Sequence, residues 1–356
     1  MALVPDKIRA EKAREEVAAW HAGQIWQPPT ASQRWFDLLF RRLCLVFAAF
    51  TIVLLLLLVF EIGAKAMPAF REHGLAFLYG RTWDPNSNVY GILPEMWGTL
   101  YTSLLALLFG SLFGVAAAIF LSEGYMGDTV FKLLKMVNLQ FHPFWGKLPE
   151  RCEVLLKNLI ELLAAVPSVV YGLWGLFVVI PLIRPYCNWL HDKCGWFPLF
   201  STDLSGPGIL PAVIVLSIMI LPTITAISRD ALVSVPPKLR MAAYGLGATR
   251  WETILGVLLP TASRGIFGGM VLAFGRALGE TMALAMLVGN ANRLTVSLFS
   301  PANTLAALLA NTFPEAGPKD IPVLMYAALV LLAITLVVNM IGAVALERAA
   351  AKAEAK

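Results

Sequence analysis

The stretch GIFGGMVLAFGRALGETMALAMLVG, residues 265–289, decides the fold class of this chain. It is apolar except for Arg276 and Glu280, and it is long enough to cross a bilayer as one helix. At 1.5 Å per residue from Ile266, Arg276 lies about 15 Å deep, near the middle of a ~30 Å hydrocarbon core. A charge at that depth is costly and usually marks a path for a charged solute. The stretch therefore predicts a membrane-spanning helix with a functional charge.

The composition of the whole chain is that of a membrane protein. Of its 356 residues, 58% are hydrophobic and 14% charged, with a mean hydropathy of +0.71, whereas about a quarter of the residues in soluble domains are charged. We therefore predict an all-α, polytopic membrane protein with six transmembrane helices. The apolar runs that qualify as spans are about 43–60, 99–121, 155–180, 208–228, 265–289 and 321–345.

The placement of lysine and arginine predicts the orientation. With the N-terminus inside, the cytoplasmic segments hold twenty of these residues, the external segments hold seven, and Arg276 is the remaining one. Cytoplasmic loops carry such an excess, so the net charge of +5 reflects topology and not nucleic-acid binding. We expect cytoplasmic tails at residues 1–42 and 346–356, on either side of a transmembrane domain at residues 43–345.

Cysteine and motif content restrict the chemistry. Cys187 and Cys194 fall in the predicted external segment 181–207, where an oxidising compartment would permit a disulfide. Two free thiols are the alternative. A metal site with His191 matches no standard zinc spacing, so we expect no metal. The chain has no G-x-x-x-x-G-K-[ST] phosphate loop and no catalytic Ser–His–Asp or Cys–His pattern, so we expect neither nucleotide binding nor catalysis by this chain.

The cytoplasmic segment 229–264 is predicted to form two short helices. The first is expected at 238–246, after two prolines. Thr249 is followed three residues later by Glu252, which is the spacing of a capping box, and Pro260 is expected to end the second helix. The segment predicts a helix–turn–helix docking element at the membrane surface. An incidental interfacial hairpin is the alternative.

This segment resembles the EAA loop of ABC importer permeases. The family pattern is Glu-Ala-Ala, a glycine four residues after the second alanine, then nine residues and Ile-x-Leu-Pro. The matching positions, with valine in place of isoleucine, are Ala242, Ala243, Gly247, Val257, Leu259 and Pro260. Met241 replaces the glutamate, which puts in doubt any salt bridge that the glutamate would make to an ATPase, but not the docking of the loop.

Three further stretches, residues 83–103, 161–181 and 276–290, are similar to PstC-type permease subunits of phosphate ABC importers. The resemblance implies a type I ABC importer permease fold in the bacterial inner membrane. It implies three partners: a second six-span permease, a cytoplasmic ATPase dimer that holds ATP and Mg, and a periplasmic phosphate-binding protein. This chain itself would bind no cofactor.

Other transport functions are alternatives to this interpretation. The chain could serve sulfate, molybdate or phosphonate, or it could be the sister phosphate permease subunit. An ion-gradient-driven secondary anion transporter would need coupling-ion carboxylates and repeat symmetry, and it would have no use for an ATPase docking loop.

The chemistry of an anionic cargo makes Arg276 the predicted ligand in the substrate path. Arginine supplies a permanent charge and a planar fork of donors. At i, i+4 on one helix, Glu280 would pair with Arg276 in the empty state, and an arriving anion would displace it. A structural pair that fixes the fifth span is the alternative. Three hydroxyls are predicted at a similar depth, each alternatively a packing group: Ser168, Tyr171 and Thr281.

Overall fold

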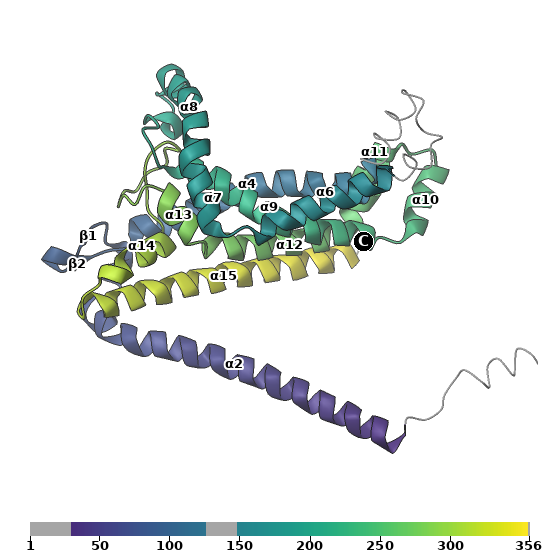
Figure 1. Cartoon of the computed structure of the whole chain (residues 1–356), viewed down its shortest axis with the longest axis horizontal. Helices are drawn as coiled ribbons and strands as arrows, with labels where there is room; N and C mark the ends of the chain where they lie inside the picture. The colour runs from purple at the N-terminus through teal and green to yellow at the C-terminus, as the bar shows by residue number, and fades with distance from the viewer. Residues whose placement is uncertain (1–29, 126–147, 355–356) are drawn as a thin grey trace, which may run out of the picture. The chain divides into compact units, whose positions relative to one another are not determined.

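The structure is a computed structural model that describes residues 30–125 and 148–354, so most of the predicted N-terminal tail lies outside the described residues. The chain divides into two units, residues 1–60 and residues 61–356. Helix α2 (Ala31–His73) runs through the boundary between them. Figure 1 shows that the described parts of both units are mainly helical.

Within the described residues, six helices are long and apolar enough to cross a membrane, which confirms the predicted all-α class and number of spans. Four of them are single helices: α2, α4 (Leu93–Ser122), α9 (Ile209–Val233) and α15 (Asp320–Glu354). The third span is the run of α7 (Ser168–Trp174), the π-helical turn η2 (Gly175–Val179) and α8 (Ile180–Cys194). The fifth span is the run of α11 (Arg250–Thr253), the π-helical turn η4 (Ile254–Leu258) and α12 (Leu259–Leu278). The shorter elements are α3 (Ala76–Tyr79), the antiparallel strands β1 (Trp83–Asp84) and β2 (Val89–Tyr90) around η1 (Pro85–Ser87), α6 (Leu148–Ala165), η3 (Pro198–Phe200), α10 (Pro237–Gly245), α13 (Met282–Leu287), α14 (Leu305–Thr312) and η5 (Phe313–Glu315).

In the first unit, residues 43–60 of α2 are apolar on every side of the helix. Its most apolar window has a mean hydropathy of 3.2 and no buried residue. Large side chains such as Phe47, Leu55 and Phe60 are exposed. A helix that is hydrophobic all round is suited to lipid, so this surface of α2 fits a membrane-spanning segment.

Helix α9 forms the centre of the second unit. Of its most apolar window 67% is buried, against 22% for α4 and 28% for the run Arg250–Leu278. Glycines let α4 approach it closely: a Cβ on Gly114 would lie 2.9 Å from Cγ2 of Ile224. The hydroxyl of Thr225 also donates to the carbonyl of Gly114 at 3.2 Å. The close contact fixes α9 against α4 around Gly114.

The third span differs from the predicted range 155–180 because the chain breaks at Pro167. The helix resumes at Ser168 and continues to Cys194. Proline has no N–H for the carbonyl of Leu163, four residues earlier. The hydroxyl of Tyr171 donates to that carbonyl at 2.8 Å. Apolar residues continue through the break, so hydropathy alone placed the span about one helical segment too early.

The fifth span also differs from prediction at both ends. Its helix begins at Arg250 and ends at Leu278, so the prediction that Pro260 ends a helix is wrong. The wider turn η4 directly precedes this proline and accommodates its ring and missing N–H. At the other end, Gly279 (φ −93°, ψ 0°) caps the helix, and α13 begins three residues later.

The possible disulfide between Cys187 and Cys194 is not formed. Both thiols are free, and both cysteines lie on helix α8 instead of an external loop. Cys194 follows Cys187 by seven positions on the helix, so at 1.5 Å per residue their Cα atoms lie about 10.5 Å apart. This is well beyond the ~7 Å that a disulfide can bridge. The alternative of two free thiols is the one that the structure supports.

Candidate functional site

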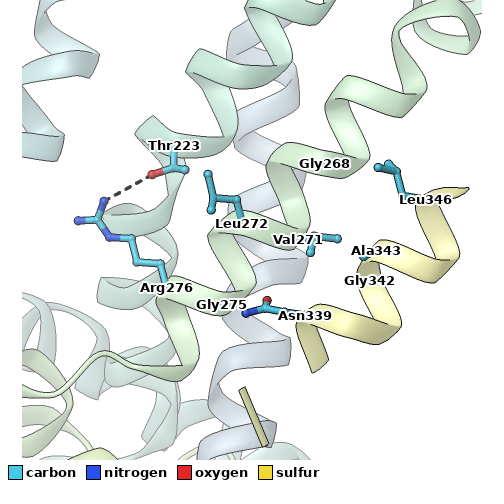
Figure 2. Close-up of a pocket in the computed structure, with 10 residues that line it drawn as sticks. All are labelled: Thr223, Gly268, Val271, Leu272, Gly275, Arg276, Asn339, Gly342, Ala343 and Leu346. Atoms are coloured by element: carbon cyan, nitrogen blue, oxygen red, sulfur yellow. Dashed lines mark hydrogen bonds between the residues drawn. The ribbon is translucent and has the colours of Figure 1, made fainter. Parts of the chain in front are cut away.

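A groove between α12 and α15 contains Arg276. Its volume is about 660 Å³, and Arg276 is the one charged residue among those that line it. In Figure 2 the guanidinium extends from α12 towards α9, where Nη1 donates to Oγ1 of Thr223 at 3.5 Å. A hydrogen bond of that length is weak. The lining residues are Thr223, Gly268, Val271, Leu272, Gly275, Arg276, Asn339, Gly342, Ala343 and Leu346.

Close packing between α12 and α15 determines the direction of this arginine. A Cβ on Gly275 would lie 2.8 Å from Oδ1 of Asn339, and a Cβ on Gly342 would lie 2.7 Å from Cγ1 of Val271. Small residues at both positions let the two helices meet at short range. Because Gly275 faces α15, the next residue, Arg276, is rotated towards α9.

The structure corrects the geometry expected for Glu280. Arg276 occupies the last turn of α12, and the chain leaves the helix at Gly279 before it reaches Glu280. The two residues therefore do not lie one above the other on one helix surface. No ion pair joins them, although both are among the described residues. The C-terminal end of α12 instead gives Arg276 a favourable helix-dipole environment.

The three predicted hydroxyls have different surroundings. Tyr171 is buried, and its hydroxyl is engaged with the carbonyl of Leu163. Thr281 donates to the carbonyl of Gly279 at 3.1 Å, within the break between α12 and α13. Ser168 is the first residue of α7 and is partly exposed. Their roles as ligands stay predictions.

Sequence reasoning did not include Thr223, the hydroxyl that the structure places against Arg276. It follows Pro222 in the middle of the fourth span, which is the same proline–hydroxyl order as in Pro167 and Ser168. The sequence signal that could have identified Thr223 is a polar residue inside a buried span. The partnership itself depends on how α9 packs against α12, which the local sequence does not specify.

A second candidate site is the hairpin of residues 237–253. After α10, Gly247 adopts a positive φ of +86°, which favours glycine and turns the chain. Oγ1 of Thr249 accepts from the backbone N–H of Glu252, while a Glu252 carboxylate oxygen accepts from the backbone N–H of Thr249 at 2.8 Å. The predicted capping box is therefore confirmed.

The hairpin exposes large apolar side chains. Leu246 is 90% exposed, Met241 72% and Trp251 62%. Ala242 is also exposed, and Ala243 is partly so. Exposed apolar clusters on an ordered element are typical of interaction surfaces. By contrast, Val257, Leu259 and Pro260 lie beyond the hairpin, in the helix that continues into the fifth span.

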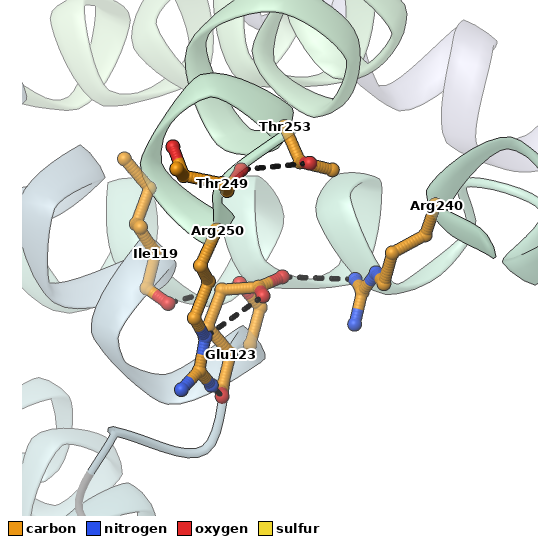
Figure 3. Close-up of polar contacts among 7 residues, drawn as sticks. Ile119, Glu123, Arg240, Thr249, Arg250 and Thr253 are labelled. Carbon is orange, nitrogen blue, oxygen red and sulfur yellow. Dashed lines mark hydrogen bonds and ion pairs between the residues drawn. The ribbon is translucent and has the colours of Figure 1, made fainter. Parts of the chain in front are cut away.

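Glu123, at the C-terminal cap of α4, connects to both helices of the hairpin. Its side chain is 2% exposed, and its oxygens lie 2.9 Å from Nη2 of Arg240 and 3.7 Å from Nε of Arg250. Figure 3 shows the two guanidiniums approaching this carboxylate from different directions. Arg250 also donates to the backbone carbonyl of Glu123 and stacks over the ring of Tyr125 at 4.1 Å. This cluster was not predicted from the sequence, since Glu123 is over a hundred residues from both arginines.

Comparison of the sequence with known proteins gives consistent matches. Residues 144–349 match the family described as binding-protein-dependent transport system inner membrane component. The chain is 36% identical over 321 residues to the phosphate transport system permease protein PstC of Xylella fastidiosa strain Temecula1, covering 89% of this chain and 92% of the relative. It is 38% identical over 311 residues to the PstC of Pasteurella multocida strain Pm70, covering 86% and 90%. A probable PstC of Methanocaldococcus jannaschii is 34% identical over 292 residues, covering 80% and 85%.

Solved structures share the fold. A chain of a bacterial alginate ABC transporter, in complex with an alginate pentasaccharide-bound periplasmic protein, aligns with a TM-score of 0.54 at 16% identity. The alignment covers 86% of this chain and 95% of that chain. Another structure of a bacterial ABC transporter for alginate import gives 0.53 at 16% identity, covering 88% and 98%. At this identity the likeness concerns the fold alone.

Proposed function

The chain belongs to the binding-protein-dependent transport system inner membrane components, as a multi-pass permease subunit of an ABC importer, and from this membership we propose that it forms half of an ATP-driven path for inorganic phosphate. The relatives named above are phosphate permeases. Phosphate is a small hydrated anion, and a guanidinium offers it charge and paired donors. Arg276 is the residue that we assign to this contact.

The observation that carries the proposal is one continuous helix. The run Arg250–Leu278 contains the second helix of the hairpin at one end and Arg276 near the other. Twenty-six residues at 1.5 Å each separate Arg250 from Arg276 by roughly 39 Å. A partner that moves the hairpin therefore moves the helix that carries Arg276. This arrangement supports a coupling role for the hairpin in a chain where we expect no nucleotide site.

The contacts of Arg276 support exchange with an anion. Its neutral partner, the hydroxyl of Thr223, is 3.5 Å away and gives only a weak hydrogen bond. A phosphate oxygen would form a shorter, charge-assisted bond in the same place. Thr223 then remains available as a donor to a second oxygen. Arg276 is exposed, so its guanidinium is accessible to an arriving anion.

We assign to Glu280 the role of keeping anions away from Arg276 until the cycle requires them. It lies in the break between α12 and α13, where the backbone is not held in a helix. Such a break can change conformation at small cost to the flanking helices, because no helical hydrogen bonds cross it. A carboxylate near the path makes the site unfavourable for an anion. Motion at the break would change the distance between Glu280 and Arg276.

The remaining members of the complex belong to the same proposal. We infer a second six-span permease, a periplasmic phosphate-binding protein and an ATPase dimer, with ATP and Mg held by the ATPase. The exposed apolar residues of the hairpin would enter the ATPase surface. Because Met241 stands where the EAA pattern has glutamate, this contact would depend on apolar packing instead of a salt bridge at that position.

Transport by the purified complex tests the proposal. The chain is expressed with candidate permease, ATPase and binding-protein subunits from the same organism, purified through a tag on the ATPase, and reconstituted in proteoliposomes. We expect it to copurify and to support ATP-dependent accumulation of [32P]phosphate. Accumulation of [35S]sulfate or molybdate, without phosphate, would contradict the assigned cargo. Uptake that follows an ion gradient and ignores ATP would contradict the class.

A further inference from the structure

The carboxylate of Glu123 is placed to transmit motion between the hairpin and the membrane helices. Resting on the proposed function, we propose that Glu123 is a positioning residue that makes α4 move with α10 and α11 when an ATPase binds the hairpin. Its side chain is 2% exposed and lies between Arg240 of α10 and Arg250 of α11. Three helices therefore meet at one buried charge (Figure 3).

The burial of this carboxylate distinguishes it from the exposed ion pairs of the chain. Exposed pairs contribute little, because solvent screens them and both side chains lose freedom. A buried carboxylate is different, because its charge depends on its guanidinium partners for compensation. The backbone carbonyl of Glu123 also accepts from Arg250, whose guanidinium lies over Tyr125. The hairpin cannot move away from the end of α4 without breaking these contacts together.

Two physical connections then run from the hairpin to the groove. The first is the continuous helix from Arg250 to Arg276. The second runs from Arg240 through Glu123 into α4, and from α4 into α9 by the close contact at Gly114. Helix α9 carries Thr223, the partner of Arg276. Arg276 and Thr223 are thus connected to the same hairpin, one through each route.

This double connection has a measurable consequence. If the charge pairs of Glu123 make α4 follow the hairpin, a neutral side chain there weakens the link and lets the ATPase turn over with less movement of α9. In the reconstituted complex, we expect Glu123→Gln to raise the number of ATP molecules hydrolysed per phosphate imported by at least about fivefold, the lower range of coupling between distant sites. The matched control is Glu161→Gln, which removes a carboxylate from the exposed pair Lys157–Glu161 on α6 and should leave the ratio unchanged.

A second pair of variants separates coupling from stability. Arg240→Gln keeps Glu123 paired with Arg250 and therefore preserves the buried charge pair, yet it removes the link to α10. We expect it to raise the ratio as well. The double variant should be no worse than Glu123→Gln alone, because both changes break one connection. Complex assembly and melting temperature are measured beside each ratio.

Two results would overturn the inference. One is an unchanged ratio in Arg240→Gln with the complex assembled, and the other is a ratio that rises equally in Glu161→Gln. A wild-type complex that imports another anion would contradict the proposed cargo and not this inference. In that case the same ratio, counted with the anion that is imported, decides the role of Glu123.

Discussion

At the scale of single residues, Glu123 and Arg276 differ in the partners that surround their charges. Glu123 is buried between two guanidiniums, whereas Arg276 has a neutral hydroxyl at 3.5 Å. A charge held in buried pairs is costly to release, and one held by a weak neutral contact can exchange its partner. Arg276 was predictable because a charge in an apolar run is conspicuous. Its partner was not, since the break at Gly279 removes the helical register on which a pairing with Glu280 depended.

Tyr171 offers a test of the break at Pro167. Tyr171→Phe leaves the carbonyl of Leu163 without the hydroxyl that now donates to it. We expect a loss of about 0.5–1.5 kcal/mol, the typical net contribution of one hydrogen bond, and a lower melting temperature in detergent. The control is Tyr186→Phe on α8, where the side chain is 72% exposed and the change should be silent. Equal melting temperatures for both variants would contradict this role.

At the scale of elements, prolines explain where sequence and structure agree and where they differ. Apolar runs predicted six spans, and six are found within the described residues. The effect of each proline was harder to predict. Pro167 interrupts a helix, whereas Pro181 and Pro260 each follow a π-helical turn and remain inside continuous helices. A π turn forms through the packing of neighbouring helices, which hydropathy and local propensity do not describe.

The turn of the hairpin gives a prediction at this scale. Gly247 has a φ of +86°, where a side chain costs about 1–2 kcal/mol. Gly247→Ala should therefore disorder the turn and reduce the amount of ATPase that copurifies with the chain. Gly245→Ala is the matched control, because a Cβ there meets no atom within 4 Å and its φ is ordinary. Equal ATPase recovery with the two variants would show that this turn geometry is not needed for docking.

At the scale of the whole molecule, the second unit joins two sites that the sequence places far apart. The hairpin and Arg276 share the helix Arg250–Leu278, and Glu123 ties the same hairpin to the helices around α9. The capping box and the family pattern made the hairpin predictable from sequence. Its continuity with the fifth span was not predictable, since the local sequence around Pro260 predicts the end of a helix. Because this helix is continuous, the two candidate sites belong to one proposed mechanism.

The most direct test of the central claim is phosphate uptake by the Arg276→Lys complex in proteoliposomes. Lysine keeps the charge but loses the planar fork of donors. We expect assembly and ATP hydrolysis to persist while uptake falls by about tenfold or more, the equivalent of one lost charge-assisted hydrogen bond. Arg264→Lys, the same change on the same helix, serves as the control and should retain uptake. Normal phosphate uptake by an assembled Arg276→Lys complex would contradict the claim that Arg276 binds the transported anion.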